Sequence, residues 1–165
     1  MDRRDYVSEK FGGMDRARAV HSSLLQAGSE EGVEFNFSHI DRTPNTIHSH
    51  RLVRLAAEHG LQTPVISAVF DAYFLEGLDI GEPEILADIG ETAGLDRERT
   101  LEFLQSDLDT DTILAEDELA RRLGVNGVPC FIVNRKYAVS GAQSPEVLIQ
   151  VFDLANQDGR PANSE

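Results

Sequence analysis

The stretch of sequence that most constrains how this chain folds is Gly124 to Gln143, GVNGVPCFIVNRKYAVSGAQ. It contains two short apolar runs, Cys130–Val133 and Tyr137–Val139, joined by the polar residues 134–136. Runs rich in β-branched and aromatic residues on either side of a short polar turn are typical of a β-hairpin. A segment with helical spacing follows directly, from Ser144 to Ala155. This part of the chain therefore predicts strand, turn, strand and helix in that order.

Pro129 stands immediately before the first of these strands. A proline is tolerated there because the first residue of a strand can lack an N–H without losing a central ladder hydrogen bond. The local pattern alone favours a trans bond, because cis bonds are a small minority even before proline. A cis bond costs only about 0.5–1 kcal/mol at an X-Pro position, and it would leave the backbone of Val128 free to pair with an extended peptide. The residues by themselves leave both forms open.

Five motifs occur in a characteristic order along the chain. They are YVSEKFGG (6–13), NTIHSHRL (45–52), DAYFLEGLDIG (71–81), GVNGVPCF (124–131) and YAVSGAQ (137–143). On these motifs the chain resembles the DsbA-like thioredoxin superfamily. Within it, the chain is most similar to the FrnE-type dithiol-disulfide isomerases, a group related to 2-hydroxychromene-2-carboxylate isomerases and kappa-class glutathione transferases.

The resemblance implies an α/β fold that is predominantly helical. We expect an incomplete thioredoxin-like fold with a large helical insertion and a C-terminal β-hairpin plus helix. The expected organisation is a helical region over residues 1–123, the hairpin and its helix over 124–156, and a disordered tail over 157–165.

The same resemblance implies a substrate-binding site. In the family the bond before the proline that matches Pro129 is cis, and a peptide or thiol substrate would add to the backbone at Val128 and Pro129 as an extra strand. A cysteinyl group such as that of glutathione would bind in the same way. Asn45 and His50 match residues near the substrate-facing side of the helical insertion. Helix capping is the competing role for Asn45 and its neighbour Thr46.

One departure from the family pattern limits the function. Family members begin with a strand, a Cys-x-x-Cys or serine-containing turn, a helix and a second strand, and none of this precedes Tyr6. Cys130 is the only cysteine, so no catalytic residue is expected. The sequence would then be a truncated form, a form whose start is assigned too late, or a natural remnant.

Three functions stay open. The first is a thiol-disulfide oxidoreductase or isomerase that is inactive as these 165 residues alone. The second is a glutathione-dependent isomerase or transferase of the 2-hydroxychromene-2-carboxylate isomerase type. The third is a non-catalytic peptide-binding or assembly module.

The remaining cysteine and histidines do not predict a reactive or metal site. A free cysteine on an apolar strand usually behaves as a small buried hydrophobe, and this is the expected role of Cys130. His48 and His50 are two apart, so they do not share a helix face, and His39 lies nine residues before His48. No cysteine or carboxylate completes a ligand set at typical spacing. We expect no metal, and no cofactor other than glutathione.

Charge and composition narrow the partners. The net charge of −14 argues against nucleic acid, which needs a basic surface. No run approaches the roughly 18 apolar residues of a membrane span, and the charged start MDRRDYVSEK lacks the apolar core of a secretory signal. A single cysteine favours a reducing compartment, so a cytoplasmic location is expected.

Helical periodicity and capping signals dominate the first 123 residues, where the polar residues 1–5 are expected to fray. An alternating run, Val33 to Phe37, predicts a short half-buried extended segment, which could pair as a strand at the open edge of the hairpin. The expected helices, with the residues that begin some of them, are 6–11, 16–27 after Asp15, 46–59, one beginning at Thr63-Pro64, 83–93, 97–106 after Asp96, and one from Thr110 or Asp111 to Leu123.

A two-stranded hairpin is marginal alone, and its open edge invites pairing with another chain. We therefore expect a homo-oligomer, most simply a dimer.

Overall fold

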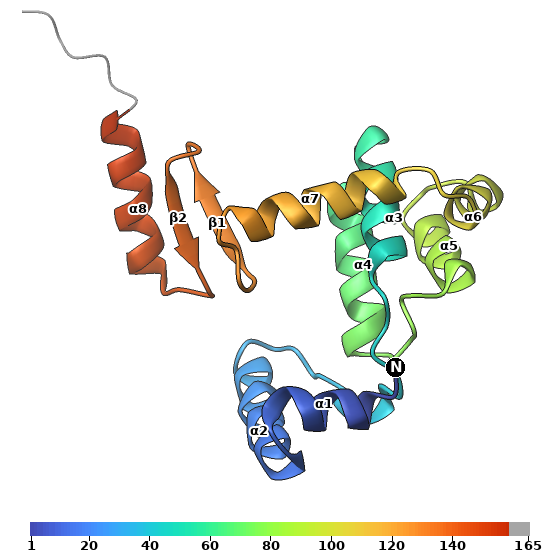
Figure 1. Cartoon of the computed structure of the whole chain (residues 1–165), viewed down its shortest axis with the longest axis horizontal. Helices are drawn as coiled ribbons and strands as arrows, with labels where there is room; N and C mark the ends of the chain where they lie inside the picture. The colour runs from blue at the N-terminus through green and yellow to red at the C-terminus, as the bar shows by residue number, and fades with distance from the viewer. Residues whose placement is uncertain (159–165) are drawn as a thin grey trace, which may run out of the picture. The chain divides into compact units, whose positions relative to one another are not determined.

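The computed structural model describes residues 1–158 and is mostly helical over that range (Figure 1). The predicted tail began at residue 157, but Gln157 and Asp158 are the last residues of a helix, and residues 159–165 lie outside the described part. The elements are α1 (Arg3–Phe11), α2 (Met14–Glu30), the 3₁₀ helix η1 (Phe37–His39), α3 (Ile47–Glu58), α4 (Gln62–Phe74), α5 (Pro83–Thr92), α6 (Arg97–Gln105), α7 (Thr110–Arg122), β1 (Cys130–Val133), β2 (Tyr137–Ser140) and α8 (Pro145–Asp158).

The chain divides into two compact units. The first comprises Met1–Leu114 and the second begins at Ala115, so the division falls inside α7. The first unit is entirely helical apart from its connections, and the second contains the hairpin and α8.

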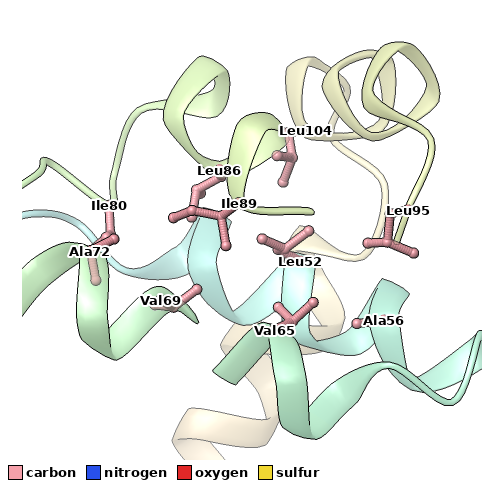
Figure 2. Packing of buried hydrophobic residues seen from close by; sticks show 10 residues of the cluster. All are labelled: Leu52, Ala56, Val65, Val69, Ala72, Ile80, Leu86, Ile89, Leu95 and Leu104. Carbon is pink, nitrogen blue, oxygen red and sulfur yellow. The ribbon is translucent and has the colours of Figure 1, made fainter. Parts of the chain in front are cut away.

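The core of the first unit lies among α3, α4, α5 and α6 (Figure 2). Helical spacing creates it, because Val65, Val69 and Ala72 lie one turn apart on the inner face of α4. Leu52, Leu86 and Leu104 are fully buried, and burial of each such side chain contributes about 1.5–3 kcal/mol. The ten clustered residues are Leu52, Ala56, Val65, Val69, Ala72, Ile80, Leu86, Ile89, Leu95 and Leu104.

Local signals begin several helices. The Oδ1 of Asp96 accepts a hydrogen bond from the backbone N–H of Arg99 at 2.9 Å, which caps α6 as predicted. Pro83 is the first residue of α5, where its missing N–H costs no hydrogen bond. Asp2 caps α1 by accepting from the N–H groups of Arg4 and Asp5.

In the hairpin of the second unit, β1 and β2 run antiparallel (Figure 1). Phe131 pairs with Val139 and Val133 pairs with Tyr137. Asn134 and Arg135 both have positive φ, 52° and 57°. The N–H of Lys136 donates to the carbonyl of Val133 at 3.1 Å. This is the geometry of a type I′ turn, whose twist matches that of a β-ribbon.

Two predicted elements near the N-terminus are wrong. Residues 33–37 form no strand; instead the N–H of Asn36 donates to the carbonyl of Phe74 at the end of α4, and η1 begins at Phe37. Residues 3–5 are helical rather than frayed, because Asp2 caps them and the N–H of Arg3 donates to the carbonyl of Asp41.

Three helix starts also differ from prediction. Helix α2 starts at Met14 after Gly13, so Asp15 lies in its first turn, and it continues to Glu30. Helix α4 starts at Gln62 rather than at Thr63-Pro64. Thr110 is the first residue of α7 rather than its cap. Helices α2 and α4 begin before the residue that carries the sequence signal, and α7 begins at that residue.

Candidate functional site

The proline edge of the hairpin is the first candidate site. The Val128–Pro129 peptide bond is cis in the structure. The carbonyl of Pro129 accepts a hydrogen bond from the N–H of Gly141 at 2.8 Å, which extends the ladder one residue beyond β1. The Val128 side chain is 89% exposed. An exposed apolar residue therefore stands at the entry to the strand.

The outer edge of β1 has no neighbouring strand among the described residues, where the sheet has the order β1-β2. Successive residues of a strand direct their backbone groups to opposite sides. Because Pro129 bonds toward β2, the N–H and C=O groups of Cys130 and Ile132 point to the outer edge. Cys130 is a free, half-buried cysteine. The outer edge therefore presents unpaired backbone donors and acceptors next to Val128.

Helix α8 holds the other end of the hairpin. The side-chain amide of Asn134 donates to the carbonyl of Ala155 at 3.0 Å. The carboxylate of Asp158 accepts from the Lys136 ammonium at 2.5 Å and from the Tyr137 hydroxyl. The hydrogen bond from Lys136 lowers the pKa of Asp158. These contacts fix the turn, which is the end of the hairpin opposite Val128.

The other two predicted site residues, Asn45 and His50, lie in the first unit. The Oδ1 of Asn45 accepts a hydrogen bond from the N–H of Ile47 at 3.1 Å, whereas Thr46 makes no side-chain cap. The Asn45 side chain therefore bonds the first residue of α3, whose N-cap position is Thr46, and its role in ligand binding stays a prediction. His50 is exposed, and its backbone N–H donates to the carbonyl of Thr46 within the first turn of α3.

Arg51 is the buried residue of this motif, which sequence reasoning missed. Its side chain is 0% exposed. Nε donates to the carbonyl of Leu108 at 2.7 Å and Nη1 to that of Leu104 at 3.0 Å. Nη2 donates to the carbonyls of Phe103 and Ser106 at 2.6 and 2.9 Å. The guanidinium thereby binds the C-terminal end of α6, which makes it a structural residue.

His48 lies beside this guanidinium. Its Nδ1 is 2.9 Å from Nη1 of Arg51 and can only accept there. Burial, and next the charge of Arg51, lower the pKa of His48. The imidazole is therefore neutral at pH 7 in the folded chain.

Within residues 1–158, no group of three or more histidine, cysteine or acidic side chains is arranged to hold a metal ion. Over the same residues, none of the helices is both long and apolar enough to cross a membrane.

Comparison with known proteins identifies the family. The DSBA-like thioredoxin domain matches residues 7–153, so the chain belongs to this domain family. The predicted resemblance is thereby confirmed at the family level. The predicted fold class, mostly helical with a small hairpin sheet, is confirmed as well.

Several relatives are thiol:disulfide interchange proteins DsbA. That of Azotobacter vinelandii is 30% identical over 118 residues, which cover 70% of this chain and 55% of the relative. That of Pseudomonas syringae pv. tomato is 33% identical over 96 residues, covering 57% of this chain and 45% of the relative. The chain thus spans about half the length of the curated relatives it matches.

A solved structure gives the same fold. The crystal structure of a probable DsbA oxidoreductase from Streptomyces coelicolor is similar with a TM-score of 0.86 and 28% identity, and the match covers 100% of this chain and 71% of that one.

Proposed function

We propose that this chain is the peptide-binding part of a DsbA-type thiol-disulfide oxidoreductase. The observation that carries the proposal is the outer edge of β1. Its backbone groups at Cys130 and Ile132 face away from β2, and the 89% exposed Val128 stands at its start. An extended peptide binds such an edge by adding a strand, with main-chain hydrogen bonds for affinity and alternate side chains for specificity. The motifs at 6–13 and 137–143 further support the FrnE-type isomerases as the nearest group.

Disulfide exchange itself requires a thiol pair. A thiolate attacks a disulfide sulfur, and a second thiol resolves the mixed disulfide while the leaving sulfur takes the electron pair. These 165 residues contain one cysteine, Cys130, whose role we infer to be packing in β1. The 165 residues alone are therefore expected to bind substrate without turning it over.

A binding experiment tests the edge. Titrating the isotope-labelled chain with an extended cysteine-containing peptide should shift the amide signals of residues 128–132 in a saturable way. The matched control is the same peptide N-methylated at alternate residues, which keeps the side chains but removes the edge hydrogen bonds. Methylation of the residues whose N–H groups point toward β1 should abolish binding, and methylation of the residues between them should leave the affinity unchanged. Shifts confined to other residues, or equal binding of both registers, would contradict the proposal.

Two further measurements, a glutathione titration and an insulin-reduction assay, distinguish this function from the alternatives. If glutathione shifts residues 128–132 and peptides do not, the glutathione-dependent isomerase or transferase is favoured instead. In an insulin-reduction assay, the chain and its Cys130→Ser variant should both give background rates. Appreciable turnover by the unmodified chain that the variant lacks would show that Cys130 is a nucleophile.

We also infer that a second copy of the chain binds the same edge when no peptide is present. Phe131 and Ile132 are 43% and 55% exposed beside it, and an open edge of this kind pairs readily with another strand. Light scattering during size-exclusion chromatography should show a dimer, and saturating peptide should convert it to a monomer. A clean monomer at all concentrations would refute this inference.

A further inference from the structure

The first unit contains a pocket that is separate from the proline edge and from Asn45 and His50. It is about 280 Å³ in volume and is lined by α1, α2, the segment 35–37 and the last residue of α4. Binding sites for small molecules range from about 300 to 1,000 Å³. The pocket therefore suits a compact molecule of one or two rings.

Aromatic rings form most of its walls. The rings of Phe35 and Phe37 stack with centroids 5.2 Å apart, and the ring of Phe74 meets that of Phe35 edge to face at 5.7 Å. His21 stacks on Phe37 at 4.9 Å, and Phe11 meets His21 edge to face at 6.5 Å. The rings are only partly buried, so each still offers surface to a ligand. Offset and edge-to-face contacts of this kind favour a flat, apolar body.

The sequence builds this wall with a close contact at Gly28. A Cβ at Gly28 would lie 2.7 Å from the ring of Phe35 and 2.7 Å from the carbonyl oxygen of Val33. Only a glycine lets segment 33–35 lie this close to α2. The irregular path of segment 33–37 thereby places two aromatic rings in the pocket.

Two cations of α1 also line the pocket, Arg3 and Lys10. The Nη1 of Arg3 donates to the Tyr73 hydroxyl at 2.8 Å, and the Nζ of Lys10 donates to the Tyr6 hydroxyl at 3.3 Å. Lys10 also lies 5.9 Å from the ring centroid of Phe11. Across residues 1–158, neither cation has a carboxylate within 4.0 Å.

The chain is acidic as a whole, with 29 acidic and 15 basic side chains. Arg3 and Lys10 bind neutral hydroxyls and ring faces instead of carboxylates. Each keeps further N–H donors for a ligand. A pocket with aromatic walls and two unneutralised cations is complementary to an anion with an apolar body.

We propose that this pocket binds a small organic anion, a carboxylate carried on one or two aromatic rings. The rings would lie against Phe35 and Phe37, and the carboxylate would accept hydrogen bonds from Arg3 and Lys10. Every residue that lines the pocket belongs to the first unit, whereas the β1 edge belongs to the second.

The test uses 2-naphthoate and the full chain, followed by amide signals. We expect saturable shifts in residues 3–11, 21–24 and 35–37. The uncharged 2-naphthamide, which has the same rings, should bind about tenfold more weakly, since a hydrogen bond to an ionised group is the stronger kind. Failure of 2-naphthoate to saturate these signals, or equal binding of the amide, would overturn the proposal.

Charge variants locate the binding group. Lys10→Gln should weaken 2-naphthoate about tenfold and leave 2-naphthamide unchanged. Lys10 is exposed, so this variant should fold even where Arg3→Gln does not. Arg16→Gln is the matched control, because Arg16 is exposed on α2 and does not line the pocket. If Arg16→Gln and Lys10→Gln weaken binding equally, the net charge and not the pocket attracts the anion, and the proposal fails.

Discussion

Replacing Arg51 by methionine tests most directly whether the buried guanidinium stabilises the first unit. Methionine keeps much of the length and apolar volume of the arginine stem but donates no hydrogen bond. The change removes donors from the carbonyls of Leu104 and Phe103 in α6 and from those of Ser106 and Leu108 in the loop that follows. It also removes a guanidinium that lies 4.8 Å from the ring centroid of Phe103.

The magnitude follows from the partners that are left. The carbonyl of Phe103 keeps the N–H and the hydroxyl of Ser106 as donors, so it is not left unpaired. The carbonyls of Leu104, Ser106 and Leu108 lose the donor that Arg51 supplied. A hydrogen bond to a charged group contributes about 1.5–3 kcal/mol, and an unpaired buried acceptor carries a penalty of similar size. We expect the unfolding free energy to fall by about 3–5 kcal/mol, and the melting temperature to fall by about 6–20 °C.

Urea unfolding followed by circular dichroism measures this change. Arg51→Lys should be nearly as destabilising, because an ammonium cannot reproduce the planar fork that reaches four carbonyls. Arg97→Met is the matched control, since Arg97 is a partly exposed arginine of α6 that pairs with Asp88 and Glu84, and surface pairs contribute little. If Arg51→Met unfolds within about 0.5 kcal/mol of the parent, or no earlier than Arg97→Met, the assigned role is wrong.

Two further changes probe the same unit. The pKa of His48 is lowered from its ordinary value of 6.5, so its contribution to stability is complete above pH 6.5 and is lost as the pH falls from there toward the lower folded value. Between pH 7.5 and 5.5 the parent should therefore lose more unfolding free energy than His48→Gln, and equal losses would contradict the contact with Arg51. A Cβ at Gly77, where φ is +77°, would lie 2.4 Å from the carbonyl oxygen of His39, so Gly77→Ala should cost about 2–4 kcal/mol. Gly60→Ala, with φ +71° and open space around it, should cost only about 1–2 kcal/mol in urea unfolding, and equal costs would show that the close approach to His39 is unimportant.

Elements marked by short-range signals could be predicted from the sequence. Pro83 and Asp96 begin α5 and α6 as expected, because N-terminal prolines and capping carboxylates act within one helical turn. The hairpin was also predictable, since its two apolar runs and polar turn are contiguous. In each of these elements, the residues that determine the local conformation lie within four positions of it in the sequence.

The segment from Val33 to Phe37 shows where this reasoning fails. Its alternation of apolar and polar residues is a strand pattern, but a strand also needs a partner. The described residues provide none here, and the N–H of Asn36 bonds to the end of α4 instead. Alternation reports which side chains are buried. It cannot report whether a sheet or a pair of helices buries them.

Arg51 shows a second limit. Within NTIHSHRL the arginine looks like the exposed polar residue that helical periodicity allows beside Leu52. Its burial depends on carbonyls more than fifty positions away, at the end of α6. No pattern within α3 contains that information, so the motif directed attention to His50, which the structure leaves exposed.

The two candidate sites differ in the same way, and this explains why only one was foreseen. The proline edge consists of the consecutive residues 128–132, so the sequence alone locates it at the start of β1. The pocket proposed to bind an organic anion is lined by Arg3 and Lys10 of α1 and by the rings of Phe35, Phe37 and Phe74. Each of those residues has an ordinary local explanation as part of a helix or a loop, and the pocket exists only because Gly28 lets segment 33–35 approach α2. Gly28→Val should therefore abolish 2-naphthoate binding while leaving peptide binding at residues 128–132 intact, because those residues belong to the other compact unit. Loss of both activities together would show that the first unit has unfolded or that the two sites are one.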